Sequence, residues 1–324
     1  QHTFAGDEGF DSGEANCVCQ STSGYIWIGT DNGIYRYDGS EFTLFPLDSD
    51  EDGTKYSINC IYLTSDDKLY VGTDNYGLYV YDNGAFNRVA ETYNLGVSTI
   101  NAMYEDDKDQ LWLASSSGIY YLTSDGVKMV DDEGISGYNI GNISGYDGTI
   151  YATANNDVLI RVDENGEITV TSKSSYGIDD INSLYIDENG TRYYGSAGYS
   201  ILTINSKGKV SVISTGSLHG INKIYNDGEK IWILADGGVG YITSGNKIVN
   251  VESLRFNESM SDMIKDFEGN YWFTSYRKGL LFLEQSKFQN VTMKYGIDSS
   301  IVNCVTSYNG SIFIGTDEGL YVVD

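Results

Sequence analysis

The strongest constraint on the fold is a short motif that recurs along the whole chain. Its clearest copy occupies residues 26–39 and reads Ile-Trp-Ile-Gly-Thr-Asp-Asn-Gly-Ile-Tyr-Arg-Tyr-Asp-Gly. Each copy is centred on one aromatic anchor, and neighbouring anchors are 39 to 43 residues apart. A fixed period near forty residues in strand-like sequence is typical of β-propeller blades. The eight anchors are Trp27, Tyr70, Trp112, Tyr151, Tyr193, Trp232, Trp272 and Phe313.

One repeat can be read in full from the second copy. Four strand-like runs, at residues 58–63, 69–73, 78–81 and 85–89, are separated by polar turns. The last of these turns is Asn83-Gly84, a strong hairpin signal. The chain has 38 Gly, 28 Tyr and a single Pro among 324 residues, and it shows no helical periodicity. Four antiparallel strands per repeat make one propeller blade, so the predicted fold is all-β.

The repeat predicts one β-propeller domain over residues 1–324, with eight repeats of about 41 residues each. His2-Thr3-Phe4 resembles a fourth strand, and the last repeat ends after the third-strand residues 320–323. We therefore favour eight blades, with the N-terminal strand pairing at residues 320–323 to close the last blade. The alternative is a seven-bladed ring, with the eighth motif beginning another propeller.

When the repeats are aligned, two sets of equivalent positions, here called columns, have expected packing roles. The anchor aromatic fills the space between blades, and a Gly two residues later leaves room for a neighbour's bulky group. Copies without this Gly, at Ala114, Leu234 and Thr274, are expected to repack locally. The second column is polar and begins the innermost strand. Its members are Asn16, Asn59, Asn101, Asn182, Asn222 and Asn303, with Asp262 in the seventh copy. These side chains either bond the backbone of the entering turn or form a polar ring that touches a ligand.

The motif resembles the two-component regulator propeller repeat. The likeness rests on Trp27-Ile28-Gly29-Thr30 followed by Gly33-Ile34-Tyr35 and Tyr37-Asp38-Gly39, and it extends over nearly the whole chain. In that family, such propellers are extracytoplasmic sensors of membrane histidine kinases or of related proteins with diguanylate cyclase outputs, and gut-bacterial members commonly detect oligosaccharides. The family's usual ring has seven blades, often with two rings in tandem.

The composition bears on partners. The formal net charge is −26, which disfavours nucleic acid or an anionic membrane as a partner, because phosphate binding needs clustered Lys and Arg. No run of 18 apolar residues and no signal peptide is present, which is typical of a mature segment or an excised domain. We expect membrane attachment only through a segment absent from this chain, and a homodimer only through the parent protein.

Catalytic residues are sparse. The two histidines, His2 and His219, are far apart, and no Ser-His-Asp order or metal-binding His spacing occurs. We therefore predict no enzyme activity and no cofactor. Asp48, Asp50 and Asp52 match the start of a calcium loop, but its twelfth position is Asn59 where Glu is expected, so a calcium site is the less favoured reading.

The cysteines are expected to be buried thiols. Cys17, Cys60 and Cys304 follow the column Asn, where other copies carry the small Ala102 or Ser183. Cys19 is the fourth, and no compact disulfide framework is visible.

The candidate ligand face combines the loops between second and third strands with the loops that enter first strands. Blade seven carries Tyr276, Arg277 and Lys278 where other copies have small or acidic turns. Tyr rings suit sugars or peptides, because they offer a flat apolar face and a polar tip. Tyr is abundant everywhere in the chain, however, so any face would show some. The other candidates on this face are Tyr56, Tyr76, Tyr93, Tyr138, Tyr176, His219 and Tyr295.

The sequence thus favours an extracytoplasmic (periplasmic or cell-surface) sensor domain of a bacterial signal-transduction protein. Its expected ligand is an oligosaccharide or another small molecule on the top face of the propeller. One alternative is a protein-interaction scaffold. The other is an enzyme similar to streptogramin lyase, which is also a propeller with Trp-centred repeats.

Overall fold

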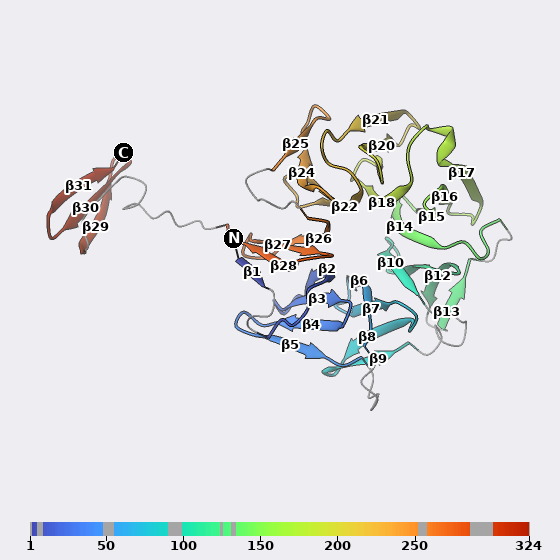
Figure 1. Cartoon of the computed structure of the whole chain (residues 1–324), viewed down its shortest axis with the longest axis horizontal. Helices are drawn as coiled ribbons and strands as arrows, with labels where there is room; N and C mark the ends of the chain where they lie inside the picture. Colours follow the sequence, from blue (N-terminus) through green and yellow to red (C-terminus); the bar gives the residue numbers. More distant parts are fainter. Residues whose placement is uncertain are drawn as a thin grey trace. The chain divides into compact units, whose positions relative to one another are not determined.

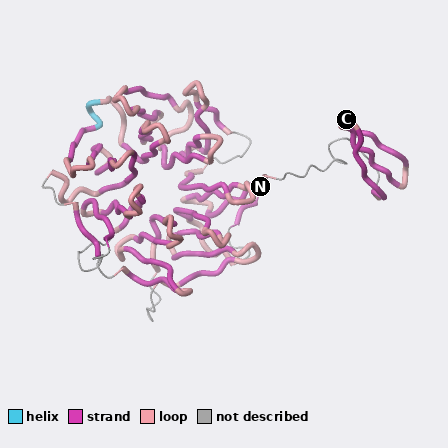
Figure 2. Tube along the Cα trace, turned by 180° about the vertical axis from the view of Figure 1, so that it is seen from behind, coloured by secondary structure: helices cyan, strands magenta, loops and turns pink. Residues whose placement is uncertain are grey.

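The computed structural model describes residues 2–4, 9–47, 55–89, 99–123, 126–130, 134–251, 258–285 and 301–323. The chain divides into two compact units, Gln1–Leu283 and Glu284–Asp324. Strands dominate both units, and one short 3-10 turn, η1 (Lys173–Ser175), is the cyan segment in Figure 2. None of the helical segments in the described ranges has the length and apolar character needed to cross a membrane.

The first unit contains seven four-stranded antiparallel sheets, each of which is one blade (Figure 1). Blade 1 consists of β2 (Ala15–Gln20), β3 (Ile26–Thr30), β4 (Gly33–Tyr37) and β5 (Phe42–Phe45). Blade 2 consists of β6 (Ile58–Leu63), β7 (Leu69–Thr73), β8 (Leu78–Asp82) and β9 (Ala85–Arg88). Blade 3 consists of β10 (Ile100–Glu105), β11 (Leu111–Ser115), β12 (Gly118–Thr123) and β13 (Gly126–Met129).

The remaining blades repeat this order. Blade 4 consists of β14 (Ile140–Tyr146), β15 (Thr149–Ala154), β16 (Val158–Val162) and β17 (Ile168–Ser172). Blade 5 consists of β18 (Ile181–Ile186), β19 (Arg192–Ser196), β20 (Ser200–Ile204) and β21 (Val210–Ser214). Blade 6 consists of β22 (Ile221–Asn226), β23 (Ile231–Ala235), β24 (Gly238–Ile242) and β25 (Ile248–Asn250). Blade 7 consists of β26 (Met260–Lys265), β27 (Tyr271–Ser275), β28 (Gly279–Leu283) and β1 (His2–Phe4).

The N-terminal strand closes the ring, but at a different blade from the one predicted. β1 pairs antiparallel with β28, with His2 opposite Phe282 and Phe4 opposite Leu280. The predicted pairing with residues 320–323 is therefore wrong, and the ring has the seven blades of the alternative prediction. Phe4 explains the choice, because its ring stacks on the blade 7 anchor Trp272 at 5.9 Å and packs against Phe42 of blade 1 at 5.1 Å.

The eighth repeat forms the second unit. Its three antiparallel strands are β29 (Val302–Tyr308), β30 (Ser311–Thr316) and β31 (Gly319–Val323). Cys304 is exposed here, in contrast to the buried thiol that its column predicts, whereas Cys17 of blade 1 is buried. The all-β propeller fold with four-stranded blades is thus confirmed, and every repeat has its own sheet.

The anchors of the first unit lie between blades, as predicted. Trp27 is 2% exposed and packs with Tyr79 and Phe86 of blade 2. Three of the anchors, Trp112, Trp232 and Trp272, are each oriented by an Asp carboxylate in the hairpin turn that precedes them. In each case the indole Nε1 donates to the carboxylate at 2.8 to 2.9 Å. These carboxylates belong to Asp106, Asp227 and Asp266.

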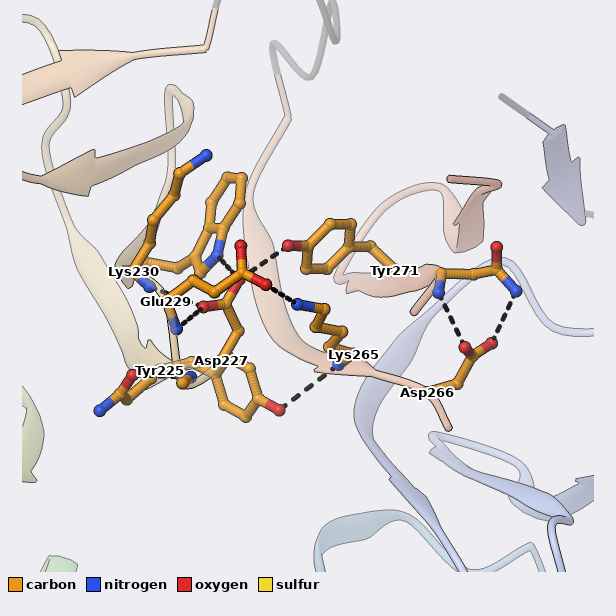
Figure 3. A network of polar contacts seen from close by, with 11 residues as sticks. Tyr225, Asp227, Glu229, Lys230, Lys265, Asp266 and Tyr271 are labelled. Carbon is orange, nitrogen blue, oxygen red and sulfur yellow. Dashed lines mark hydrogen bonds and ion pairs between the residues drawn. The ribbon is translucent and has the colours of Figure 1, made fainter. Parts of the chain in front are cut away.

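The turn carboxylate of blade 6 also joins blade 6 to blade 7 (Figure 3). Asp227 Oδ2 accepts from Trp232 Nε1 and, at 2.7 Å, from the hydroxyl of Tyr271 in the next blade. Its Oδ1 accepts from the main-chain nitrogens of Glu229 and Lys230. Burial raises the pKa of Asp227, but these hydrogen bonds outweigh burial, so the pKa lies below its usual value.

We expect Asp227→Asn to lower the free energy of unfolding at neutral pH by about 1–3 kcal/mol, because charge-assisted hydrogen bonds are lost. A lowered folded-state pKa stabilises the fold above the unfolded-state value of about 4, and this contribution disappears as the pH falls through the folded-state pKa. The difference in the free energy of unfolding between wild type and variant should therefore narrow below about pH 4. Urea unfolding followed by Trp fluorescence at several pH values measures this difference.

A matched control is Asp163→Asn. The Asp163 carboxylate accepts from the main-chain nitrogens of Asn165 and Glu167 in a similar turn, and it has no indole or phenol donor among the described residues. This variant should lose less stability than Asp227→Asn. Equal losses in the two variants would contradict the role given to Trp232 and Tyr271.

Candidate functional site

Hydrogen bonds between the first strands of neighbouring blades surround the axis of the ring. Near the start of each first strand, one polar side chain donates to a main-chain carbonyl of the next blade at 2.7 to 3.2 Å. The donor–acceptor pairs, in ring order, are Asn16 to Ile58, Asn59 to Ile100, Asn101 to Ile140, Asn142 to Asn182, Ser183 to Ile221, Asn222 to Met260 and Ser261 to Ala15. The last bond, from blade 7 to blade 1, completes the circle.

This circle refines the prediction for the polar column. The amides bond the next blade, not the turn that enters their own strand. The column also includes Ser261 in place of Asp262, because the strand register aligns Asp262 with Cys17, one position further along. Counting back from the anchor is misleading here, because the hairpin of blade 6 is one residue shorter than that of blade 7.

The circle encloses an axial cavity of about 320 Å³. Its lining is mainly polar and includes the column amides Asn16, Asn59, Asn101 and Asn222. Pockets that bind small molecules have volumes of roughly 300–1,000 Å³, so this cavity lies at the lower end of that range. The cavity is therefore large enough for one small polar ligand.

An ion pair breaks the uniform lining of this cavity. Lys223 Nζ of blade 6 lies 3.3 Å from Asp262 Oδ1 of blade 7. Asp262 also accepts from its neighbour Met263 N and, at 3.4 Å, from Val18 N of blade 1. The Asp262 carboxylate raises the pKa of Lys223, which keeps the amine charged. Blades 6, 7 and 1 thus meet at one charged pair beside the axis.

The predicted top face is confirmed by main-chain hydrogen bonds. In six blades, a main-chain nitrogen in the loop after the second strand donates to a carbonyl one or two residues before the first strand. These pairs are Asp74 with Ser57, Ser116 with Thr99, Asn155 with Asn139, Ala197 with Asp180, Asp236 with His219 and Tyr276 with Ser259. The two sets of loops therefore share one face, as the propeller pattern predicts.

A group of side chains on this face, over blades 5 to 7, is named here the rim cluster: Tyr199, His219, Asp236, Ser259 and Tyr276. Asp236 Oδ1 accepts from Ser259 Oγ at 2.6 Å, and its Oδ2 lies 4.0 Å from His219 Nδ1. The His219 ring meets the Tyr199 ring edge-on, with centroids 5.6 Å apart. Tyr199 and Tyr276 remain 58% and 41% exposed, so two aromatic faces stand beside a polar centre.

The rim cluster is continuous with the axial cavity. Asn222 lines the cavity and also donates to Asp236 Oδ1 at 2.9 Å. Tyr276 belongs to both, and burial together with the nearby Asp262 raises the pKa of its hydroxyl. The phenol therefore stays protonated and able to donate a hydrogen bond. A ligand on the rim could extend one end toward Lys223.

The structure brings together only part of the predicted site. Tyr276 and His219 lie in the rim cluster, and Arg277 is exposed on the Tyr276 loop. Lys278 is paired instead with Glu258, at 3.0 Å.

The other tyrosine candidates that the structure describes serve packing. Tyr56 is buried against the ring of Tyr76, and Tyr138 and Tyr176 are half-buried against apolar clusters. Tyr93, Tyr295 and the acidic triad Asp48, Asp50 and Asp52 lie outside the described residues. Within the ranges that are described, no group of three or more His, Cys, Asp or Glu side chains could hold a metal ion.

Tyr199, Asp236, Ser259 and Lys223 are site residues that the sequence patterns missed. Lys223 had a usable signal, since it occupies a position that holds Cys, Ala, Asn or Ser in the five preceding blades. Gly220 was a second signal. Its φ of +59° favours glycine, and the Asp236 carboxylate lies 2.3 Å from where a Cβ would stand.

The fold and the site together define a seven-bladed propeller whose top face carries a polar, aromatic-flanked cluster above an axial cavity. No family model matches the sequence, and neither does any curated protein. Solved structures with the same fold include the extracellular domain of a protein from B. thetaiotaomicron described as a hybrid two-component system, BT3049. It shares 17% identity and a TM-score of 0.75 over 100% of this chain and 48% of that chain.

Two further structures are similar. The extracellular domain of BT4673, also described as a hybrid two-component system of B. thetaiotaomicron, has 20% identity and a TM-score of 0.70 over 99% of this chain and 45% of that one. Virginiamycin B lyase of Staphylococcus aureus has 16% identity and a TM-score of 0.65 over 88% and 98% of the two chains. This chain spans about half the length of the two-component domains. At such identities the likeness shows the fold, and the two-component domains agree with the resemblance of the repeat.

Proposed function

We propose that this chain is an extracytoplasmic, ligand-binding sensor domain of a bacterial signal-transduction protein, and that it has no enzyme activity. Two similar structures are extracellular domains of proteins described as two-component systems, and this supports both the role and the location. The chain spans about half of those extracellular domains, and the proposal concerns ligand binding by this part alone.

The observation that carries the proposal is the chemistry of the rim cluster. Asp236 and His219 can bond hydroxyl groups, and the exposed rings of Tyr199 and Tyr276 offer flat apolar faces. Sugars present both kinds of surface at once, with hydroxyls at the ring edge and C–H groups on the ring faces. An oligosaccharide is therefore the ligand class that the rim cluster suits best.

We expect Tyr199→Ala and Tyr276→Ala each to weaken a cognate oligosaccharide about ten-fold, because truncating an aromatic contact at a binding site commonly costs more than 1 kcal/mol. Both side chains are substantially exposed, so the melting temperature should change little. A thermal-shift screen of oligosaccharides identifies the ligand, and calorimetry on the variants measures the loss.

Phe267→Ala is the control, since Phe267 is 70% exposed on the opposite side of blade 7, in the turn between β26 and β27. It should leave the affinity unchanged. Binding that is insensitive to both Tyr variants would move the site away from the rim cluster.

A second candidate function is a lyase. Virginiamycin B lyase has a similar fold and is described as inactive when one histidine is replaced by alanine. Here His219 lies beside Asp236 on the top face. A turnover assay on streptogramins with a divalent metal tests this candidate, and product formation that disappears in His219→Ala would replace the sensor proposal.

A further inference from the structure

Lys223 is the side chain in the axial cavity that blade packing does not explain. At the equivalent position, blades 4 and 5 use the neutral Asn142 and Ser183 to bond the next blade. A lysine there brings a charge next to the axis, which is costly unless the charge is paired or used. Blade 6 already joins blade 7 through Asn222, so the ring does not need Lys223 for that link.

The ion pair leaves Lys223 with capacity to bind more. Asp262 is 9% exposed, and its carboxylate is engaged by Lys223, Met263 N and Val18 N. The Lys223 side chain, by contrast, is 46% exposed, and it lines the cavity. An ammonium group carries three donors, and Asp262 Oδ1 accounts for one of them. The cavity therefore contains a positively charged group that still has N–H donors available to a ligand.

The rest of the lining includes several Asn side-chain amides. The side-chain nitrogens of Asn16, Asn59 and Asn101 each donate to a main-chain carbonyl of the next blade. Their amide oxygens remain as the acceptors available to a ligand, and hydroxyl groups are suitable donors to them. The protonated phenol of Tyr276 adds a flat face at the rim of the cavity.

We propose that the axial cavity binds a hydroxylated carboxylate, such as a sugar acid, with its carboxylate on Lys223 and its hydroxyls on the surrounding amide oxygens. The inference rests on the proposed function and names the ligand class of that site more narrowly. The cavity of about 320 Å³ matches one such ring. The bound residue is either a free sugar acid or the acidic end of an oligosaccharide that continues over the rim cluster.

Calorimetry on the wild-type protein tests the inference without any variant. Glucuronate and galacturonate are compared with glucuronamide, which keeps the shape but lacks the charge, and with glucose and galactose. We expect the uronates to bind about ten-fold or more tightly than the amide, because a charge-assisted hydrogen bond contributes roughly 1.5–3 kcal/mol. Comparing the affinity of a disaccharide that ends in a uronate with that of the free uronate shows whether the cavity binds the acidic end of a glycan or the free acid.

The variants assign the effect to Lys223. Lys223→Met should reduce uronate affinity to that of the amide, and Lys223→Arg should retain part of it. Lys207→Met, in the exposed turn between β20 and β21, is the matched control and should change nothing. Asp262→Asn, which removes the competing carboxylate, should tighten uronate binding wherever the variant folds.

Equal binding of uronate and amide to the wild type overturns the inference, and so does uronate affinity that survives Lys223→Met. The proposed function is tested separately. A neutral oligosaccharide whose affinity falls in Tyr199→Ala supports the sensor proposal even when uronates show no preference, since Tyr199 is not among the residues that line the axial cavity.

Discussion

A chain without residues 1–6 is expected to unfold at a much lower denaturant concentration than the full chain, because blade 7 loses its fourth strand. β1 contributes three paired residues to β28, and Phe4 is 5% exposed between Trp272 and Phe42. Replacing a buried Phe by Ala alone costs about 3–5 kcal/mol, so Phe4→Ala should already produce much of the loss. Removing the strand also exposes the edge of β28.

The matched control is removal of residues 319–324, which deletes β31 from the second unit. Under the observed pairing, the unfolding transition of the ring should not move, because β1 belongs to β28. Urea unfolding followed by Trp fluorescence suits this comparison, since all four Trp residues are blade anchors of the first unit. If the C-terminal deletion destabilised the ring, this result would favour the eight-bladed prediction, in which the N-terminal strand pairs with residues 320–323.

The comparison with the sequence shows what a repeat can predict. The anchors, the strand order and the face formed by the loops follow from periodicity, since each blade repeats the same local pattern. The blade that receives the N-terminal strand does not. Residues 279–283 and 319–323 are both apolar third strands that begin with Gly, so either could accept His2-Thr3-Phe4 by pattern. The decision comes from the packing of Phe4 on Trp272, a contact between distant parts of the chain.

The sequence predicted two residues of the rim cluster, His219 and Tyr276. Tyr276 was found because its loop differs in charge and bulk from the tight turns elsewhere. Tyr199 was missed, since Ser196-Ala197-Gly198 before it resembles an ordinary turn. Its role depends on the His219 ring, which arrives from the next blade. Asp236 likewise gains its partner Ser259 across a blade boundary. The site is formed by contacts between blades, and such contacts cannot be predicted from the pattern of a single repeat.

Gly29→Ala is expected to lower the free energy of unfolding by about 1–3 kcal/mol, the usual cost of overfilling a core. A Cβ on Gly29 would lie 2.5 Å from the thiol of Cys17, its cross-strand partner, and 2.5 Å from Ile58 in the next blade. Both neighbours are buried, so neither can move without disturbing the packing between blades 1 and 2.

Blade 3 shows how the same position accepts a methyl group. There Ala114 stands in the place of Gly29, and its cross-strand partner is Ala102 instead of a cysteine. Cys17→Ala removes the sulfur that an alanine at 29 would strike, so the double variant Cys17→Ala/Gly29→Ala reproduces the blade 3 pair. It should be more stable than the sum of the two single changes predicts, by about 0.5–3 kcal/mol, which is the usual coupling between residues in contact.

Urea unfolding of the two single variants and the double variant completes the cycle, with Gly13→Ala as control because no atom lies within 4 Å of a Cβ built at Gly13. That control should stay within about 0.5 kcal/mol of wild type. Strict additivity of the Cys17 and Gly29 changes would mean that the clash with Ile58, not the thiol, determines the glycine. The glycine would then be needed only to leave room for the neighbouring blade, which is the role that its position in the repeat predicts.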